Sequence, residues 1–360
     1  MPARVVLAMS GGVDSSVAAY LLKRQGYEVI GLFMRTGVHS AEAGRAPKKG
    51  CCSALDAGDA RRVADRLDIP FYALDFASDF DRLIDYFADE YLAGRTPNPC
   101  VVCNNWLKFG KLWSYGKQLG ADYIATGHYA RLVERAGRHE LYRAADPDKD
   151  QSYVLFGLRR VVLPHLLFPI GGYCKDEVRA LARAAGLGVA DKPDSVEICF
   201  VPDGDHGALV RRRRPEPATA GKIVDAAGRV LAEHGGIENF TIGQRKGLGY
   251  AAGERRYVLR IVPGANEVVV GRREDLLAPG LIASGVNWLI EPPAGPLPCA
   301  AKVRYRHTAA PATVTALPDG GARVEFAEPQ SALTPGQAVV FYDGPHVLGG
   351  GWIERPLQEK

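Results

Sequence analysis

Short apolar runs alternate with helix-like segments through the first 130 residues, and this alternation constrains the possible folds more than any other feature. Strands are predicted for the apolar runs at residues 4–9, 27–34, 70–76 and 121–126. Helices are predicted for residues 15–25, 54–67, 79–93 and 104–119. Strands that are apolar throughout and separated by helices are typical of a parallel sheet buried on both faces. We therefore expect an α/β domain with a doubly wound parallel sheet.

The pattern changes further along the chain. A hairpin is expected at residues 131–134 and 140–143, and a helix at residues 175–185 that ends at Gly186. After about residue 205, paired short strands around Gly and Asp turns predict small, mainly β domains. Residues 211–219, RRRRPEPAT, resemble a linker. The expected domains are the α/β domain at residues 1–205, a small β-rich domain at 206–276 and a C-terminal β-barrel at 277–360.

Composition narrows the class of protein. A chain of 360 residues is long enough for two or three domains. No apolar stretch reaches the roughly 18 residues of a membrane span. The first residues lack the layout of a signal peptide, so we expect a cytoplasmic protein without a membrane partner. The net charge of +4 permits a nucleic-acid partner but does not imply one.

The cysteines are the most reactive side chains in the sequence. There are seven, an odd number, which argues against a structural disulfide framework. Cys100 and Cys103 form a C-x-x-C pair within TPNPCVVCN, and Cys199 lies in DSVEICF. We expect Cys103 to lie near the start of a helix, where the helix dipole lowers the pKa of a thiol. The others are expected to be packing cysteines: Cys51, Cys52, Cys174 and Cys299.

Three roles are conceivable for Cys100, Cys103 and Cys199. A zinc ribbon needs two Cys pairs, and only one C-x-x-C is present. An iron–sulfur cluster could use all three cysteines and leave one iron position open. Alternatively, two of the thiols could carry sulfur as a persulfide. The residue pattern alone leaves the last two roles open.

A glycine-rich turn joins the first predicted strand to the first predicted helix. Its sequence, SGGVDS at residues 10–15, matches neither the Walker pattern nor the dinucleotide-binding fingerprint. Backbone amides at a helix N-terminus nevertheless favour an anion such as a phosphate. Asp14 would repel that anion unless a cation lies between them, and Mg²⁺ would resolve the conflict. The alternative is that Ser10 or Asp14 only caps the helix.

Basic residues gather at three places in the second half of the chain. These are residues 211–214, then Arg255, Arg256 and Arg260, and finally Lys302, Arg304 and Arg306. The last three alternate, so on a strand they would share one face, with Tyr305 on the other. That arrangement suits contacts with an RNA backbone, although an ordinary solvated strand has the same pattern.

Taken together, these motifs resemble one family. The turn SGGVDS resembles the pyrophosphate loop of the N-type ATP pyrophosphatases, and the whole set of motifs resembles the bacterial tRNA-specific 2-thiouridylases. The matching segments run through nearly the entire chain and are far more specific than the turn alone. They include AMSGGVDSS, GCCS, DARRVADRLDIPFY, GRTPNPCVVCN, ATGHYAR, DKDQSYVLF, KPDSVEICFV, FTIGQRKGLG, VRYR and LTPGQAVVFYDG.

The resemblance implies an ATP- and Mg²⁺-dependent enzyme that adenylates C2 of the wobble uridine of tRNA and installs sulfur there. It implies that Cys199 receives a persulfide from a donor protein, either a cysteine desulfurase or a sulfur-relay protein. Cys103 then attacks the persulfide or resolves it as a disulfide. Asp14 is expected to hold Mg²⁺ through the nucleotide. ATP is expected to contact Ala8, Met9, Ser10, Gly11, Gly12, Val13, Asp14, Ser15, Met34 and Gly127.

The resemblance also implies a binding site for tRNA. The target base is expected at Asn98, Pro99 and Cys100, and it must leave its stack to reach a buried thiol. Further contacts with the tRNA are expected at His128, Lys149, Asp150, Gln151, Arg304, Tyr305 and Gln337.

Cys100 departs from the family pattern, because many members carry an Asp there that is assigned as an acid/base group. A thiol with a pKa of about 8.5 is a poorer base at neutral pH than a carboxylate. Either Cys100 serves as a thiolate, or another group such as a phosphate takes the proton, or the step matters less here. Rival functions are an iron–sulfur-dependent tRNA thiolase on the same fold, an amide-forming ligase and a non-catalytic RNA-binding module.

Overall fold

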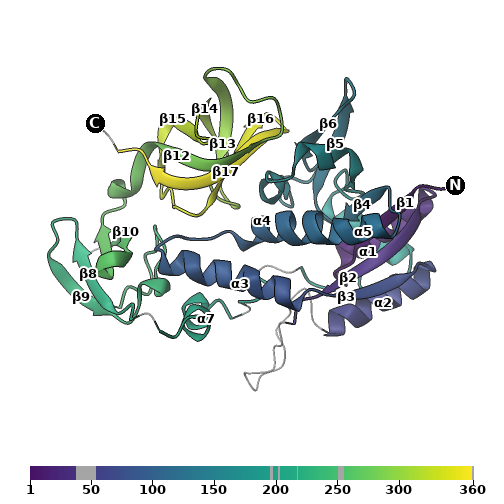
Figure 1. Ribbon diagram of the computed structural model, residues 1–360, viewed down its shortest axis with the longest axis horizontal. Helices are drawn as coiled ribbons and strands as arrows, with labels where there is room; N and C mark the ends of the chain where they lie inside the picture. Colours follow the sequence, from purple (N-terminus) through teal and green to yellow (C-terminus); the bar gives the residue numbers. More distant parts are fainter. Residues whose placement is uncertain (38–53, 195–197, 202, 217, 250–254, 359–360) are drawn as a thin grey trace. The chain divides into compact units, whose positions relative to one another are not determined.

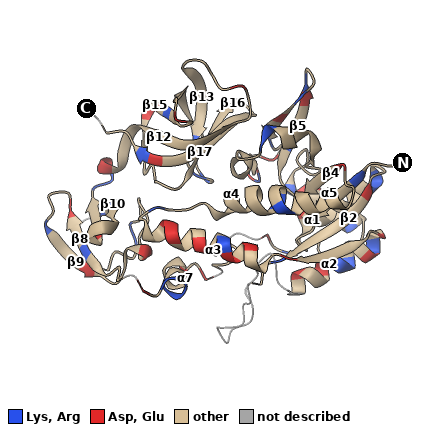
Figure 2. Ribbon diagram, viewed as in Figure 1, with Lys and Arg blue, Asp and Glu red and all other residues tan. Residues whose placement is uncertain are grey.

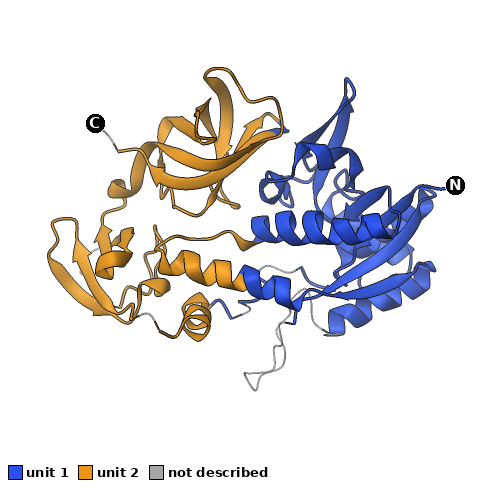
Figure 3. Ribbon diagram, in the orientation of Figure 1, with its two compact units in different colours: residues 1–83, 100–204, 345–347 blue, residues 84–99, 205–344, 348–360 orange. Residues whose placement is uncertain are grey.

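The computed structural model describes residues 1–37, 54–194, 198–201, 203–216, 218–249 and 255–358 (Figure 1). Cys51 and Cys52, two of the predicted packing cysteines, lie outside these residues. The chain forms two compact units (Figure 3). The first contains residues 1–83, 100–204 and 345–347, and the second contains residues 84–99, 205–344 and 348–360. The second unit therefore includes a short piece, residues 84–99, of the predicted α/β domain.

A parallel sheet forms the core of the first unit and confirms the predicted α/β class (Figure 1). The strand order is β3-β2-β1-β4-β7, so the chain runs outward from β1 in both directions. Sheets of this kind bind ligands where the carboxyl ends of the two diverging strands meet, here β1 and β4. The strands are β1 (Arg4–Ala8), β2 (Glu28–Arg35), β3 (Phe71–Asp75), β4 (Tyr123–Thr126) and β7 (Leu166–Leu167).

Strand β1 is apolar on both faces because both faces are covered. Val5 and Leu7 belong to a buried cluster with residues of the helices that pack on one face. Val6 points the other way, toward Gly116, where a Cβ atom would lie 2.5 Å from Val6 Cγ2. The helices of this region are α1 (Val13–Arg24), α2 (Ala54–Leu67), α3 (Ala77–Leu92), α4 (Pro99–Cys103), η2 (Asn104–Leu112), α5 (Trp113–Gln118) and α6 (Lys175–Ala184), with short 3-10 helices η3 (Ser152–Leu155) and η4 (Arg160–His165).

The helix that carries Cys100 and Cys103 begins five residues earlier than predicted. α4 starts at Pro99 and runs directly into the π-helical η2 and then α5. Pro is favourable in a first helical turn because the N–H group that it lacks would have no helical partner there. The helix predicted for residues 104–119 is therefore the C-terminal part of a longer one, and this changes the position of the cysteines within it.

The predicted hairpin is confirmed, with longer strands than expected. β5 (Ala130–Arg135) pairs antiparallel with β6 (Arg138–Arg143). The turn between them is Ala136-Gly137, with φ angles of 48° and 73°. Two successive positive φ angles are the requirement of a type I′ turn, whose twist suits a two-residue hairpin.

The second unit contains two β structures. A mixed sheet has the order β10-β11-β8-β9, and a second set of strands closes into a barrel in which β12 pairs with both β15 and β17. The barrel confirms the expected C-terminal architecture. The elements are β8 (Gly221–Asp225), β9 (Val230–His234), η5 (Ile237–Asn239), β10 (Tyr257–Val262), η6 (Pro263–Ala265), β11 (Glu267–Gly271), η7 (Glu274–Leu276), β12 (Leu277–Trp288), β13 (Leu297–Lys302), β14 (Ala310–Ala316), β15 (Ala322–Ser331), β16 (Ala338–Asp343) and β17 (His346–Pro356).

The linker predicted at residues 211–219 is wrong for its first part. Helix α7 (His206–Arg213) includes three of the four arginines. Arg213 Nε lies 2.7 Å from Asp85 Oδ1, and Arg214 Nε lies 2.8 Å from Asp89 Oδ1, both on α3. Figure 2 shows that α3 carries several acidic residues along its length. Arg213 and Arg214 therefore tie the C-terminal end of α7 to α3, since each of these two guanidinium groups binds a carboxylate there.

No helix among the described residues combines the length and the apolar composition needed to cross a lipid bilayer.

Candidate nucleotide and sulfur-transfer site

The glycine-rich turn lies at the carboxyl end of β1, the place that the sheet order predicts for a ligand. Gly12 caps α1, and Gly11 adopts φ +74°. A Cβ atom on Gly11 would lie 2.2 Å from the backbone oxygen of Asp56. Both the backbone conformation and the lack of space therefore require glycine at position 11. We call residues 10–15 the phosphate loop.

Hydrogen bonds from a hydroxyl group hold the loop together, and the residue after β4 packs against it. Ser15 Oγ accepts a hydrogen bond from the Ser10 backbone N–H at 3.2 Å and donates to the Gly12 carbonyl at 3.2 Å. Gly127 packs against the first turn of α1, where a Cβ atom would lie 2.6 Å from the backbone nitrogen of Ser15. The structure thus brings together the two segments, residues 10–15 and Gly127, that the sequence predicted for ATP.

Asp14 is held by two neighbours. Tyr129 donates from its hydroxyl to Asp14 Oδ1 at 2.8 Å, and Lys175 Nζ donates to both carboxylate oxygens at 2.8 and 2.9 Å. Burial and the Asp14 charge raise the pKa of Tyr129, so its hydroxyl remains a donor at neutral pH. The protein's own ammonium thus compensates the charge of Asp14.

A second carboxylate shares that ammonium. Asp194 lies 2.7 Å from Lys175 Nζ, 2.8 Å from Lys149 Nζ and 3.2 Å from an Arg179 nitrogen. Burial acts to raise the pKa of Asp194, but the hydrogen bonds from Lys149 and Lys175 outweigh it, and the pKa is lowered. Asp194 is therefore an anion surrounded by three cations.

Lys192 provides another cation at the same edge of the sheet. Its Nζ donates to the Gly11 carbonyl at 2.9 Å and to Asp56 and Asp59, each at 2.6 Å. Burial acts to lower the pKa of Lys192, but the two carboxylates outweigh this and raise it. Bare glycine backbone, a helix N-terminus and buried ammonium groups suit the phosphates of a nucleotide.

The described residues contain no cluster of three or more His, Cys, Asp or Glu side chains that could hold a metal ion by themselves. Asp14 is the only acidic residue of the loop sequence SGGVDS. A magnesium ion would therefore need phosphate or water oxygens for most of its ligands, which is how this ion usually binds with nucleotides. The carboxylate chemistry of Asp14 fits that role.

The helical position of the cysteines differs from the prediction. Because α4 starts at Pro99, Cys100 lies in its first turn and Cys103 is its last residue. Cys103 is the fifth residue of the continuous helix that starts at Pro99, so Cys100 lies closer to the helix N-terminus than Cys103 does, and the predicted effect on the Cys103 thiol stays a prediction. Cys100 is exposed, while Cys103 and Cys199 are half-buried.

The surroundings of Cys299 and Cys174 can be compared with the packing role predicted for them. Cys299 lies on β13, and burial raises the pKa of its thiol to about 12, so it is a poor nucleophile and fits the predicted packing role. Cys174 is exposed and caps α6, where its backbone N–H donates to Glu177 Oε2 at 2.7 Å. The prediction of a packing role is therefore wrong for Cys174.

Other predicted ligand contacts lie at the ends of elements. Met34 is half-buried near the end of β2, and Met9 is buried just after β1. In the second unit, Asn98 is half-buried and Pro99 is buried. Gln337 donates from Nε2 to the carbonyl oxygens of residues 96 and 97, at 2.9 and 3.2 Å. Gln337 thus supports the loop that precedes the predicted target-base residues.

Four residues predicted to touch tRNA make internal contacts. His128 is buried and bonds to Thr126 Oγ1 at 2.7 Å, and burial, then the charge of Lys108, holds its pKa well below 6.5. Asp150 is buried and accepts from the backbone N–H of Ala144 and Ser152. Gln151 accepts from the Tyr129 N–H at 3.0 Å, and Lys149 binds Asp194 as described. Their contact with tRNA stays a prediction.

The basic strand predicted around residue 304 is wrong. β13 ends at Lys302, and residues 303–306 form a turn. Lys302 Nζ lies 5.7 Å from the centroid of the Tyr305 ring, so these two side chains meet and do not point to opposite faces. Arg304 is half-buried and donates to the Ser331 carbonyl at 3.1 Å. Val303, at the start of this turn, is buried.

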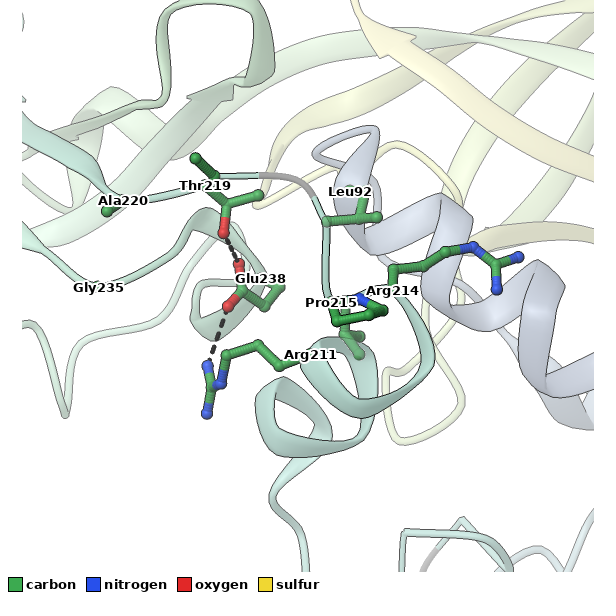
Figure 4. Close-up of a pocket in the computed structure, with 10 residues that line it drawn as sticks. Leu92, Arg211, Arg214, Pro215, Thr219, Ala220, Gly235 and Glu238 are labelled. Carbon is green, nitrogen blue, oxygen red and sulfur yellow. Dashed lines mark hydrogen bonds and ion pairs between the residues drawn. The ribbon is translucent and has the colours of Figure 1, made fainter.

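The second unit also has a cleft of about 290 Å³ beside α7 (Figure 4). Its buried Glu238 accepts from Arg211 at 2.9 Å and from Thr219 Oγ1 at 2.6 Å. None of the site residues predicted from the sequence is among the described residues that line this cleft. The cleft therefore adds no group to the candidate site.

Sequence reasoning missed several residues of the site. Tyr129 follows Gly127 and His128 directly, and Lys192 and Asp194 stand in the quoted segment KPDSVEICFV, so proximity in sequence could have suggested them. Proximity in sequence could not have suggested Lys175, because it lies 161 residues from its partner Asp14.

Three family models match successive parts of the chain. Residues 3–203 match the tRNA methyl transferase HUP domain, residues 210–272 the tRNA methyl transferase PRC-barrel domain, and residues 278–353 the aminomethyltransferase beta-barrel domain. The first match alone covers more than half of the chain, and its limits contain the phosphate loop and the three candidate cysteines.

Curated relatives match over almost their full length. The chain is 51% identical to the tRNA-specific 2-thiouridylase MnmA of Rhodopirellula baltica, over 98% of this chain and 97% of the relative. It is 51% identical to the protein of the same name from Geotalea uraniireducens, over 99% and 96% of the two chains. A third, from Carboxydothermus hydrogenoformans, is 50% identical over 98% of both. The chain therefore belongs to the tRNA-specific 2-thiouridylase family.

Proposed function

We propose that this protein transfers sulfur to C2 of the wobble uridine, position 34, of tRNA, with consumption of ATP. The observation that carries the proposal is the phosphate loop at the carboxyl end of β1, in the same unit as Cys103 and Cys199. Family membership supports the same reaction, because curated relatives over the whole chain are named tRNA-specific 2-thiouridylases.

The phosphate loop is the proposed nucleotide site. ATP, with Mg²⁺ at Asp14, would supply an AMP group that turns the uridine C2 oxygen into a good leaving group. Glycine at positions 11 and 127 lets the loop pack closely against the backbone of Asp56 and Ser15, and the first amides of α1 would present their partial positive charge to phosphate oxygens. Lys175 and Lys192 add positive charge to the same edge.

Cys199 and Cys103 are the proposed sulfur-transfer pair. Cys199 accepts one sulfur atom from a donor protein and becomes a persulfide. The terminal sulfur attacks C2 of the uridine, and the bond from C2 to the activated oxygen breaks with release of AMP. The Cys103 thiolate cleaves the sulfur–sulfur bond and forms a disulfide with Cys199, which a reductant must then restore.

Cys100 occupies the position of an acid/base group in many relatives. Its place in the first turn of α4 favours the thiolate, so a base role for its sulfur is compatible with the helix. The proposed target-base residues Asn98 and Pro99 precede it directly in the sequence. We propose that the remaining tRNA contacts involve Arg304, Tyr305 and Gln337 in the second unit.

The test is a product assay with the purified chain, a tRNA transcript, Mg·ATP and a sulfur-donor protein charged with persulfide. Nucleoside mass spectrometry is expected to find 2-thiouridine, with AMP and pyrophosphate in solution. Release of ADP and phosphate would contradict adenylation. Asp14→Asn is expected to lose turnover if the carboxylate holds the metal. A coloured protein whose activity requires iron would support the iron–sulfur thiolase instead.

A further inference from the structure

We infer that Lys192 is a positioning residue that fixes the orientation of the peptide group between Gly11 and Gly12 in the phosphate loop. The inference rests on the proposed function, because it takes this loop as the nucleotide site. Neither the predicted ATP contacts nor the predicted tRNA contacts include Lys192. It would act on the phosphates of ATP through the backbone of the loop, without touching them.

The peptide group between Gly11 and Gly12 is flanked by two residues that have no Cβ atom. The torsion angles that rotate this group, ψ of Gly11 and φ of Gly12, are therefore less restricted than they would be between other residues. In a trans peptide the carbonyl and the N–H point in opposite directions, so a rotation of the group would exchange the two. A contact from outside the two glycines is needed to select one orientation.

Lys192 supplies such a contact. Its Nζ donates to the Gly11 carbonyl at 2.9 Å, and this bond holds the carbonyl on the side of Lys192. The Gly12 N–H then points to the opposite side. Gly12 is the N-cap of α1, and no side chain caps the helix there. The first N–H groups of a helix have no partner within the helix and suit an anion, so the Gly12 N–H can serve as a further donor for a phosphate.

Two carboxylates of α2 hold the ammonium group in place. Lys192 Nζ lies 2.6 Å from Asp56 Oδ1 and 2.6 Å from Asp59 Oδ2. These two residues are three positions apart, so they lie on the same face of the helix. The three N–H groups of an ammonium match the three acceptors, which are these carboxylates and the Gly11 carbonyl. Lys192 therefore has no further N–H for a phosphate while the three bonds last.

The first turn of α2 also contacts the loop directly. A Cβ atom on Gly11 would lie 2.2 Å from the backbone oxygen of Asp56, which belongs to this turn. Gly11 is buried, and the side chains of Lys192, Asp56 and Asp59 are 22%, 11% and 21% exposed. Because little water reaches these groups, the three hydrogen bonds of Lys192 have few competitors. The turn and the lysine together hold the Gly11 carbonyl.

The test measures ATP affinity and needs no turnover. Equilibrium dialysis with labelled Mg·ATP gives the Kd of the full chain and of its variants. Lys192→Met keeps an unbranched side chain but removes the ammonium, and its Kd is expected to rise by about tenfold, because a hydrogen bond from a charged group no longer holds the loop. Lys192→Arg should keep part of the affinity, since a guanidinium can donate to several oxygens.

Asp59→Asn separates positioning from a simple effect of charge. Removal of a negative charge near a phosphate site strengthens the attraction for ATP, so an electrostatic role alone predicts a lower Kd. Positioning predicts a Kd that is higher by about threefold, because an amide holds an ammonium less strongly than a carboxylate does. The same variant decides the question if Lys192→Met does not fold.

Adenosine separates positioning from a general loss of structure. It has no phosphates, and it is added as a competitor of labelled ATP. A displaced loop donor should leave the affinity for adenosine unchanged in Lys192→Met and in Asp59→Asn, whereas a disordered site would lower this affinity together with that for ATP.

Lys23→Met is the matched control. Lys23 also donates to a backbone carbonyl, that of Asp68 at 2.6 Å, but it lies in the last turn of α1 and its side chain is 42% exposed. This variant is expected to bind ATP as the wild type does. An unchanged Kd in Lys192→Met, an unchanged or lower Kd in Asp59→Asn, or an equal loss of adenosine affinity overturns the inference and leaves the proposed function intact. Wild-type protein that binds no ATP overturns both.

Discussion

Gly127 lies against the backbone of Ser15, so closely that a Cβ atom on Gly127 would be 2.6 Å from the Ser15 nitrogen and 2.8 Å from the carbonyl carbon of Asp14. These atoms belong to the first turn of α1, whose backbone has little freedom to move. The close approach joins the ends of β1 and β4, where the order of the sheet predicts a ligand.

Gly127→Ala is therefore expected to displace the phosphate loop. Overpacking against backbone costs about 1–3 kcal/mol of unfolding free energy, and we expect ATP affinity to fall by about tenfold or more. Thermal unfolding and equilibrium dialysis measure the two effects. Gly172→Ala is the control, because a Cβ atom there meets nothing within 4 Å. Unchanged ATP affinity in Gly127→Ala would show that the loop tolerates the displacement.

The three cysteines of the proposed reaction are expected to respond differently to substitution. Cys199→Ser and Cys103→Ser should each lose 2-thiouridine formation, because sulfur transfer needs an acceptor and a resolving thiolate. Cys100→Asp should keep activity, and Cys100→Ser should be intermediate. Nucleoside mass spectrometry with a sulfur-charged donor gives the yield of each variant.

Peptide mapping under non-reducing conditions supplies an independent result for these thiols. A disulfide between Cys103 and Cys199 is expected after turnover. Cys299→Ser is the control, since this thiol is half-buried on β13 of the barrel and its pKa is raised. A dominant bridge between Cys100 and Cys103, or a Cys100→Asp variant as inactive as Cys199→Ser, would mean that the three roles are wrongly assigned.

Reversing the charge of Arg304 is expected to weaken tRNA binding. If its guanidinium touches a phosphate, Arg304→Glu should lower the slope of log affinity against log salt by about one. Filter binding at several salt concentrations measures this slope. Arg323→Gln is the control, because Arg323 is already paired with Glu325 at 2.9 Å on the same barrel. A slope that stays the same in Arg304→Glu would place Arg304 outside the RNA interface.

His128 is expected to make the fold less stable in mild acid. Burial, and then the charge of Lys108, holds its pKa well below the ordinary value of 6.5. Below pH 6.5 the unfolded chain therefore binds a proton that the folded chain does not. As the pH falls below 6.5, His128 therefore lowers the free energy of unfolding by up to about 1.4 kcal/mol per pH unit, until the pH reaches the pKa of His128 in the folded protein.

His128→Gln should abolish that part of the pH dependence. Urea unfolding at pH 7.5 and pH 5.5 is expected to show a smaller loss of stability in the variant than in the wild type. His139→Gln, on the half-exposed strand β6, serves as the control. Equal losses in wild type and His128→Gln would show that the histidine is protonated in the folded protein.

Much of the fold could be predicted from local patterns. Each predicted strand and helix of the α/β region exists, and the bounds of α2 (Ala54–Leu67) are those predicted. Strand β15 shows why, since Ala322, Val324 and Phe326 are buried while Arg323 and Glu325 are exposed. The alternation of apolar and polar residues indicates which face of an element is buried, and this alternation can be seen among residues that are close together in the sequence. The phosphate loop was equally visible, because its glycines serve a local backbone conformation.

The sequence by itself determined the elements, the barrel that follows them and the glycine-rich loop between β1 and α1. Tertiary structure decided which charges meet. Residues 211–214 looked like a basic linker, yet Arg213 and Arg214 bind carboxylates on α3, and the bridge from Lys175 to Asp14 joins residues 161 positions apart. An ion pair depends on the distance between two side chains in space, and a local sequence pattern does not determine that distance. The order of the strands determines it here, because it brings the ends of β1 and β4 and the start of α6 to the same edge of the sheet.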